Sequence, residues 1–438
     1  MDPYCEAVDL YRSKFFTAEF AARPFWGTAL PSDNTPTERG ALPATADVVV
    51  IGGGLTGLTA ARVLSNAGRD VVVFDADKAG SAASSRNAGM LGWHSRHSFT
   101  GLIDTVGHDA AVRFYRELRQ IFDLAVRTIT GENIACDFRQ HGRFIGATSQ
   151  ASYDELKREY KTRADLLGEN TEIVTASRSE IDTDCYHGGV VIRDNASINP
   201  ALYSRGIRAL AEQAGARVFD FHRVTGLTKD TDGFTIQIAD KVIRSKDVLV
   251  ATNGHTTRLT PWLFSRLIPI NAYMVATEEI EPGILSTLFP GDRTYVESRG
   301  RSNYMQLSKD GKRIIFGGQT GSWPVNIIRV AYTLRQSLVQ MFPALENVRI
   351  SHAWTGRCAA TADLFPKFGS HDGVHYALGY CFSGNAMAPY LGMQAANKIL
   401  GVPVSSAFEA RTFPQAAWYT RNDMLISLYM WYLDKSGH

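Results

Sequence analysis

The sequence has little of what marks exported, disulfide-bonded, metal-binding, membrane-spanning or nucleic-acid-binding proteins. Its five cysteines are scattered over 438 residues without a C-x-x-C pair, so neither a disulfide framework nor a zinc site is expected. No apolar run reaches the ~18 residues of a membrane span, and residues 1–12 carry three acids and no apolar signal-peptide core. The formal net charge of +2 gives no preference for nucleic acid or anionic lipid. We therefore expect a cytoplasmic protein without a membrane span, a nucleic-acid partner or a metal, whose oligomeric state stays open.

A βαβ unit between Asp47 and Asp75 organises the chain. The β-branched run at residues 48–51 is typical of a strand buried on both faces of a parallel sheet. A helix with apolar residues at helical spacing follows, and residues 71–74 form a second buried strand. Three glycines separate the first strand from the helix in G-x-G-x-x-G spacing: Gly52, Gly54 and Gly57.

Each of these glycines has a physical task. The first permits the tight turn, the second lets the backbone approach a pyrophosphate, and the third lets the helix pack close to the sheet. Asp75 ends the second strand, where a carboxylate accepts hydrogen bonds from an adenosine ribose and disfavours a 2′-phosphate. The unit predicts a bound dinucleotide; a glycine turn without a ligand is the alternative.

A loop of small residues follows at 79–92 and ends before Trp93 and His94. Its backbone can come close to a ligand, and Ser84 and Arg86 are available to phosphate oxygens. A surface loop without a ligand is the alternative interpretation. Its position directly after the second strand favours ligand contact.

The other expected elements divide the chain between two sheets. The prolines and aromatic residues of 1–45 indicate an arm packed on the body. Hairpin signals indicate an antiparallel sheet in the second half, and a glycine-opened helix begins at Gly384. Helices are expected at 108–129, 151–168 and 199–215, and strands at 138–146, 218–224, 234–238, 241–244, 248–254, 295–298, 303–307, 313–317 and 374–379.

Three segments together resemble the D-amino acid oxidase (DAO) superfamily of flavoproteins. They are residues 50–58, the Ser-Arg-Asn-Ala-Gly loop within 83–90, and residues 378–389, in a match that runs from about 46 to 402. The aromatic arm, the loop and the tail at 429–434 look most like γ-glutamylputrescine oxidase-type and glycine oxidase-type members.

The resemblance implies FAD as cofactor and an α/β fold. A Rossmann-like, discontinuous FAD-binding domain is expected beside an α+β substrate-binding domain with an antiparallel sheet. The expected boundaries are 1–45 for the arm, 46–100, 180–260 and 350–410 for the FAD-binding domain, 101–179 and 261–349 for the substrate-binding domain, and 411–438 for a carboxyl-terminal packing segment.

The resemblance also implies oxidation of a C–N bond in a primary or secondary amine or an amino acid. Hydride transfer to flavin N5 would give an imine that hydrolyses to a carbonyl product, with oxygen or another electron acceptor reoxidising the flavin. Two alternatives stay open. A C–OH (hydroxy acid) dehydrogenase would need a histidine base, His94 or His255, and a non-catalytic FAD-binding subunit of a hetero-oligomer would need none.

The family motifs imply a set of cofactor-binding residues: Gly52, Gly54, Gly57, Asp75, Ser84, Arg86, Asn87, Gly89, Met90, Val224, Cys358, Gly384, Asn385, Ala386 and Met387. Candidate catalytic residues are His94, Tyr304 and Arg357. His94 follows the flavin-side loop, and Tyr304 lies on an alternating strand. Arg357 lies one residue before the position of a carboxylate-binding arginine in amino-acid-oxidising relatives. Surface ion pairing is the alternative for Arg357.

Two departures bear on the flavin. Sarcosine oxidases link flavin covalently through a cysteine in a C-x-x-T context, which Cys358 and Thr361 reproduce; a buried cysteine with non-covalent FAD is favoured. Some oxidases place a lysine over the flavin where this chain has an isoleucine within residues 313–318. Direct reaction with oxygen and dehydrogenase activity therefore both stay open.

Overall fold

The computed structural model describes residues 14–30, 41–175, 177–299, 302–321 and 326–416. The first part of the predicted arm and most of the predicted carboxyl-terminal segment, with its tail at 429–434, lie outside these ranges. No helix within them has the length and apolar character needed to cross a membrane.

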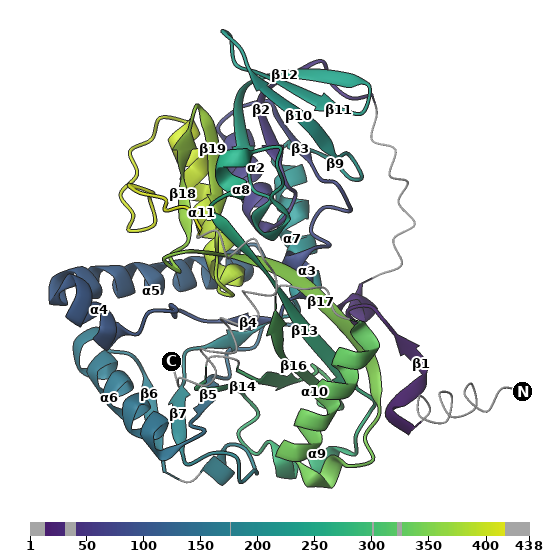
Figure 1. The fold of residues 1–438 in the computed structure, drawn as a ribbon, viewed down its shortest axis with the longest axis vertical. Coiled ribbons are helices and arrows are strands. Elements are labelled where there is room, and N and C mark those ends of the chain that lie inside the picture. Colours follow the sequence, from purple (N-terminus) through teal and green to yellow (C-terminus); the bar gives the residue numbers. More distant parts are fainter. Residues whose placement is uncertain (1–13, 31–40, 176, 300–301, 322–325, 417–438) are drawn as a thin grey trace, which may run out of the picture.

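A mainly parallel sheet forms the upper half of the molecule in Figure 1. Its parallel strands run in the order β9 (Arg217–Phe219), β3 (Val71–Phe74), β2 (Thr45–Ile51), β12 (Lys241–Val250) and β19 (Val374–Leu378). An antiparallel strand, β18 (Lys367–His371), pairs with β19, and the hairpin β10 (Val224–Lys229) and β11 (Phe234–Ile238) pairs with the first half of β12.

The apolar run of β2 is buried because both faces of this sheet are covered. Val48 and Val50 pack in one core with the helices α2 (Leu55–Asn66), α7 (Pro200–Gln213) and α11 (Gly384–Ile399), whereas Val49 and Ile51 pack in a second core with residues of the β10–β11 hairpin. Strand alternation therefore feeds both cores. The predicted βαβ unit and Rossmann-like architecture are confirmed.

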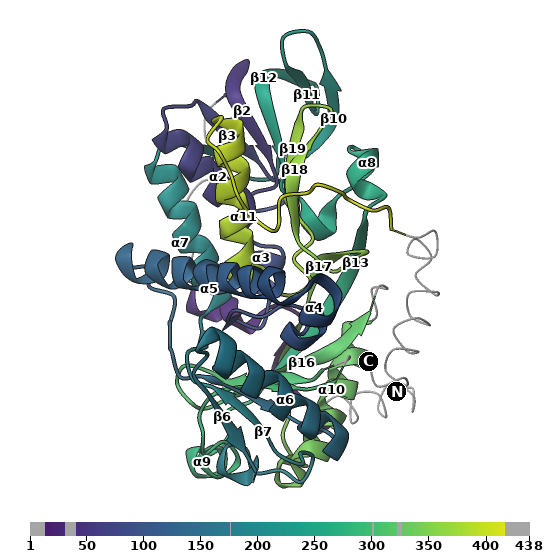
Figure 2. The ribbon, with the colours of Figure 1, turned by 90° about the vertical axis from the view of Figure 1, so that its left-hand side faces the viewer.

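A nine-stranded, mostly antiparallel sheet forms the other half. Its order is β1 (Phe16–Ala21), β17 (Ile350–Thr361), β13 (Leu267–Thr277), β16 (Ile314–Gly321), β15 (Tyr304–Leu307), β14 (Thr294–Glu297), β5 (Arg143–Gly146), β7 (Gly189–Ile192) and β6 (Thr171–Val174). Two long strands, β13 and β17, extend from this sheet toward the parallel one (Figures 1 and 2). The helix α10 (Ile327–Met341) packs on β13, β16 and β17, and α9 (Pro282–Leu288) lies nearby; α6 (Gln150–Leu167) packs on β6 and β7.

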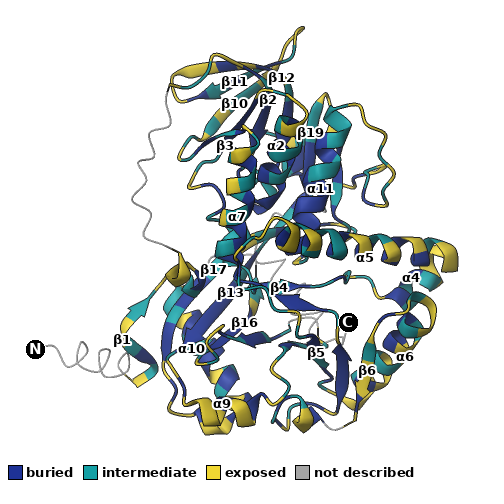
Figure 3. Cartoon of the chain, turned by 180° about the vertical axis from the view of Figure 1, so that it is seen from behind, coloured by how far each residue is buried: buried dark blue, intermediate teal, exposed yellow. Residues whose placement is uncertain are grey.

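The long helix α5 (His108–Gly131) joins the two halves. It packs against α11 from the parallel half and against α4 (Phe99–Val106) and α6 from the other. Helical spacing within 108–129 places Tyr115, Leu118, Phe122, Ala125 and Ile129 on one face, and this face is buried, whereas the outer end of the helix is exposed (Figure 3). The remaining short elements of the described residues are α3 (Ala83–Arg86), α8 (Pro261–Phe264), the two-stranded pair β4 (Met90–Leu91) and β8 (Ala196–Ser197), and the 3-10 helices η1 (Phe25–Ala29), η2 (Ser177–Ser179), η3 (Asn253–His255) and η4 (Pro343–Leu345).

The described part of the amino-terminal arm packs on the body. Strand β1 adds to the edge of the nine-stranded sheet in parallel with β17, and the side chains of Phe16 and Trp26 are buried. At the other end of the chain, the backbone carbonyl of Phe413 accepts a hydrogen bond from Arg266. The ring of Phe413 packs on Trp262 and Tyr376.

Sheet membership differs from the expected domain boundaries at two strands. The expected boundaries place residues 189–192 and 350–361 in the FAD-binding domain, but β7 and β17 each pair with strands of the nine-stranded sheet. The predicted strand at 218–224 is broken into β9 and β10, whereas the strands predicted at 241–244 and 248–254 are one continuous strand, β12. Alternation of side chains indicates a strand but does not specify its partner.

Candidate active site

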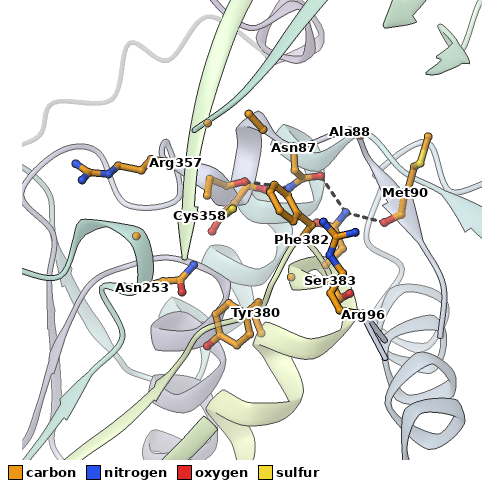
Figure 4. A pocket seen from close by; sticks show the side chains of 18 of the residues that line it. Asn87, Ala88, Met90, Arg96, Asn253, Arg357, Cys358, Tyr380, Phe382 and Ser383 are labelled. Carbon is orange, nitrogen blue, oxygen red and sulfur yellow. Dashed lines mark hydrogen bonds between the residues drawn. The ribbon is translucent and has the colours of Figure 1, made fainter. Parts of the chain in front are cut away.

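One continuous cavity of about 1790 Å³ is lined by both halves of the molecule. At one end lie the carboxyl ends of β2, β3 and β12, and at the other lie side chains of β5, β14, β15 and α6. Figure 4 shows the middle of this space, where residues that follow β3 meet β17 and the start of α11. The parallel-sheet end is where open α/β sheets bind ligands.

The glycine turn leaves space that a side chain would fill. Gly52 adopts φ +106° and donates its N–H to the carbonyl of Phe74 (2.8 Å). A Cβ on Gly57 would lie 2.0 Å from the carbonyl oxygen of Gly52, so only glycine lets α2 start this close to the strand. Gly54 opens α2, where the first helical amide, that of Leu55, donates to the hydroxyl of Ser84 (3.1 Å). The turn, the helix start and α3 together form a cradle whose shape suits a pyrophosphate.

Asp75 lines the cavity next to this cradle. Its Oδ2 accepts from the amide of Gly53 (2.8 Å) and its Oδ1 accepts from the amide of Asp77 (2.9 Å). Burial raises the pKa of Asp75, and these two amides oppose the rise. Val224, at the start of β10, lines the same end of the cavity. The position suits a carboxylate that accepts from a ribose hydroxyl.

Asn87 ties the loop after β3 to the start of α11. Its Oδ1 accepts from the amide of Gly89 (2.8 Å) and from Asn385 Nδ2 (2.9 Å), which also donates to the carbonyl of Met90 (2.9 Å; Figure 4). The Oδ1 of Asn385 is buried and has no hydrogen-bond partner among the described residues, although Asn385 lines the cavity. An amide oxygen that lacks a donor here is available to a bound cofactor.

Arg86 supplies positive charge to the same region. Its Nε donates to the carbonyl of Ser81 (2.8 Å), and burial lowers the pKa of its guanidinium. No carboxylate of the described residues lies within ion-pair distance of it. Arg86 lines the cavity beside Ser84 and is therefore placed to contact an anionic group of a cofactor.

His94 and Arg143 occupy the other end of the cavity. Arg143 Nη1 donates to His94 Nδ1 (3.2 Å) and Arg143 Nε donates to Thr294 Oγ1 (3.3 Å). Because a guanidinium has no acceptor, His94 must accept through Nδ1 and carry its hydrogen on Nε2. Burial, followed by the charges of Arg143, Arg163 and Arg96, holds the pKa of His94 well below its usual value. His94 is therefore neutral at neutral pH.

Tyr304 lines the cavity because its partner on the next strand is glycine. It pairs with Gly317 in the β15–β16 ladder, and a Cβ on Gly317 would lie 2.1 Å from the Tyr304 ring. Burial raises the pKa of the phenol, which stays protonated. Gln306, on the same face of β15, instead donates to the carbonyl of Ala88.

Arg357 and Cys358 are neighbours on β17 and their side chains diverge. Figure 4 shows the guanidinium of Arg357 on the other side of the strand from the Cys358 thiol. Arg357 is exposed at the cofactor end, where its charge helps burial to lower the pKa of His255. Burial, and to a lesser degree Cys381, raises the pKa of the Cys358 thiol to about 12. Arg357 therefore lines the same cavity as His94 and Tyr304 but lies at its cofactor end.

Most of the predicted cofactor residues meet around the cavity, including Gly384, Asn385 and Ala386 at the start of α11. Gly57, Gly89 and Met387 do not line it. Gly57 and Gly89 act through close backbone packing, since a Cβ on Gly89 would lie 2.2 Å from the carbonyl of Ile198. The side chain of Met387 is 3% exposed and belongs to the core beneath the helix.

Sequence reasoning gave no role to Arg143, although a strand was expected at 138–146. An arginine at a buried strand position was the available signal, but the facing of the strand was not known. Phe382 was also missed. It has φ +74°, unusual for a bulky residue, and its ring lies at the cavity beneath the guanidinium of Arg96 (5.0 Å).

Comparison with known proteins identifies the family. The family model described as DAO, FAD dependent oxidoreductase, matches residues 47–398. The chain belongs to this family. It is a DAO-family FAD-dependent oxidoreductase, and the glycine cradle, Asp75 and the unpartnered Asn385 oxygen fit such a cofactor.

Individual relatives cover most of this DAO-family chain. A γ-glutamylputrescine oxidoreductase of Escherichia coli K12 is 28% identical over 369 residues, covering 82% of this chain and 84% of the relative. A glycine oxidase of Bacillus licheniformis is 24% identical over 380 residues, covering 82% of this chain and 94% of the relative. The crystal structure of glycine oxidase from Geobacillus kaustophilus superposes with a TM-score of 0.70 at 21% identity, covering 85% of this chain and 99% of that one, which shows a shared fold.

Proposed function

We propose that this DAO-family enzyme oxidises the C–N bond of an amine or amino acid. The observation that carries the proposal is the state of His94, the histidine at the end of the cavity away from the glycine turn. Its Nδ1 lone pair is occupied by Arg143, and its Nε2 carries hydrogen. The other candidate base, His255, lies at the cofactor end of the cavity near Asp75. Oxidation of a C–OH group needs a base for the hydroxyl proton, whereas a neutral amine needs none, because its nitrogen lone pair forms the imine. Relatives named γ-glutamylputrescine oxidoreductase and glycine oxidase support the same chemistry.

FAD would lie along the cradle described above. Gly52 and Gly54 would face the pyrophosphate, Asp75 would accept from the ribose, and the residues at the start of α11 would contact the flavin. When bound, FAD would supply the acceptor for the hydride of the substrate α C–H bond; loss of that hydride would convert the neutral amine to an iminium ion, and loss of its N–H proton to water would give the imine. Water then adds to the imine and releases a carbonyl compound and an amine or ammonia.

The residues of this chain would keep the substrate amine reactive. Burial disfavours a charged ammonium, so enclosure in the cavity would lower the pKa of a bound amine. The ring of Tyr304 and the wall around it would exclude water from the reacting carbon, and the buried position of the phenol keeps it a hydrogen-bond donor. No residue is required to remove a proton from carbon.

The proposal adds two details to what family membership establishes: the electron acceptor and the attachment of the flavin. The cavity lining among the described residues contains arginines and no lysine, and Ile315 is buried against Met274 and Trp354. Some related oxidases have a lysine over the flavin at this position, and this chain does not, so we propose either oxygen or another oxidant as the electron acceptor. FAD attachment is proposed to be non-covalent.

The proposal is tested by the absorption spectrum of the purified yellow protein under anaerobic conditions. Putrescine derivatives, N-methyl amino acids, D-amino acids, glycine and aminophosphonates are added singly, with hydroxy acids as a second panel. Bleaching of the flavin band by an amine class supports C–N oxidation. Bleaching by hydroxy acids alone, or by neither panel, contradicts it and favours a C–OH dehydrogenase or a subunit that needs a partner.

A further inference from the structure

Arg143 is a buried cation without a carboxylate partner. Its side chain is 3% exposed, and it lies on β5 in a ladder between Thr294 of β14 and Ile192 of β7. Two of its three nitrogens donate to neutral groups, and Nη2 has no hydrogen-bond partner among the described residues. None of the described carboxylates lies within 4.0 Å of the guanidinium. A buried charge without a counter-charge destabilises a fold, and an anionic ligand bound to Arg143 would supply that counter-charge.

Two other arginines near this end of the cavity, Arg163 and Arg299, each form an ion pair with a carboxylate. Arg163 forms ion pairs with Glu169 (2.5 Å) and Glu159 (3.8 Å), both on or just after α6. The side chain of Arg299 pairs with Glu297 (2.6 Å). Of the acids that line this end, Glu159 and Glu297 are therefore already in ion pairs and Glu155 is exposed, so none of them neutralises Arg143.

The surroundings of Arg143 also favour an anion. The three arginines whose charges lower the pKa of His94 are Arg96, Arg143 and Arg163, and only the last has an ion-pair partner among the described residues. His94 presents a neutral ring with hydrogen on Nε2, for which no partner is found in the described part of the chain. A planar guanidinium beside a ring N–H donor matches the two oxygens of a carboxylate.

We propose that Arg143 binds a carboxylate group of the substrate, with His94 beside it, so that the preferred substrates are amines that also carry a carboxylate. This rests on the proposed function and adds the substrate class to it. It replaces Arg357, which points to the other side of β17, as the substrate anchor. The guanidinium would orient the substrate through its carboxylate and leave the amine end toward the flavin.

The binding test needs no turnover. The holoenzyme is titrated with straight-chain carboxylates from acetate to hexanoate and with their neutral amides, and binding is followed by the flavin absorption change and by calorimetry. We expect wild-type protein to bind at least one carboxylate, and its amide about 100-fold more weakly. Arg143→Gln is expected to lose this preference, and Arg143→Lys to keep part of it because it retains charge without the planar fork.

Arg193→Gln is the matched control. Arg193 follows the residue that pairs with Arg143, but its side chain is about half exposed and pairs with Glu172. The Arg193→Gln substitution removes the same charge from the residue that follows β7 and should leave carboxylate binding unchanged. Equal binding of carboxylate and amide by wild-type protein, no binding of either, or the same carboxylate preference in Arg143→Gln would each overturn the proposal.

A stability measurement separates binding from a structural role. Removal of an uncompensated buried charge should leave the melting temperature of the ligand-free holoenzyme unchanged or higher. The rise in melting temperature that carboxylate gives wild-type protein should disappear in Arg143→Gln. A lower melting temperature with an intact carboxylate response would mean that Arg143 is structural.

Failure here differs from failure of the proposed function. If amines with and without a carboxylate bleach the flavin equally well in both proteins, C–N oxidation stands and the role of Arg143 falls. If no amine bleaches the flavin but the carboxylate preference depends on Arg143, the anion site stands and the reaction must be sought elsewhere.

Discussion

The indole N–H of Trp26 donates a hydrogen bond to the backbone carbonyl of Asn87 (2.8 Å) and so connects the amino-terminal arm to the cofactor loop. The carbonyls on either side are held in the same way. Trp354 Nε1 of β17 donates to Arg86 O (3.0 Å), and Gln306 of β15 donates to Ala88 O. Three distant segments thus fix three consecutive carbonyls of one loop.

Replacement of Trp26 should therefore weaken FAD binding although the residue does not line the cavity. Trp26→Phe retains most of the buried ring and loses the hydrogen bond, which leaves a carbonyl without its donor. We expect FAD affinity to fall about fivefold, the equivalent of ~1 kcal/mol for one such bond. Quenching of FAD fluorescence on titration with apoprotein measures it. Trp26→Phe protein with unchanged FAD affinity and unchanged melting temperature would show that the arm does not support the loop.

The glycine turn gives a second prediction with an internal control. Gly57→Ala places a Cβ 2.0 Å from the carbonyl oxygen of Gly52, so α2 must move away from the strand. We expect a loss of more than about 3 kcal/mol in unfolding free energy and protein purified without bound flavin. Gly131→Ala, at the exposed end of α5 with nothing near the new methyl group, should be neutral or stabilising by up to ~1 kcal/mol. Chemical denaturation and the flavin-to-protein absorbance ratio compare the two variants.

The contrast between these two glycines shows where sequence reasoning succeeds. The spacing of Gly52, Gly54 and Gly57 after a buried strand predicts the cradle, because the constraints are local to one βαβ unit. The sequence did not predict that β7 and β17 belong to the nine-stranded sheet, since the partners of a strand can lie far away in the chain. The role of Arg143 could not be predicted for the same reason, because it depends on contacts with His94 and Thr294 from other segments and on the lack of a nearby carboxylate among the described residues.

FAD affinity should also depend on pH through Asp75. In the proposed site the ionised carboxylate would accept from the ribose, so affinity should be highest above the pKa of Asp75 and fall as the pH falls through it. Because burial raises this pKa above the ordinary 3.8, the loss should begin at a higher pH than for an exposed aspartate. Asp75→Asn should bind FAD more weakly at neutral pH and show a flat profile over the same range. Titrations of apoprotein with FAD from neutral to mildly acidic pH measure both profiles, and a wild-type profile as flat as that of Asp75→Asn would contradict the assigned role.

Cys358 gives the last prediction, on the attachment of the flavin. The thiol lines the cavity within reach of a cofactor, but nucleophilic attack on a flavin requires the thiolate. Burial raises the pKa of this thiol to about 12, so the thiolate is scarce at neutral pH and we expect FAD to be bound without a covalent link. Acid precipitation should then release all of the yellow colour into the supernatant, from wild-type protein and from Cys358→Ala alike. Flavin that stays with the wild-type pellet and leaves the Cys358→Ala pellet would show that the bound cofactor itself lowers the thiol pKa enough for the bond to form.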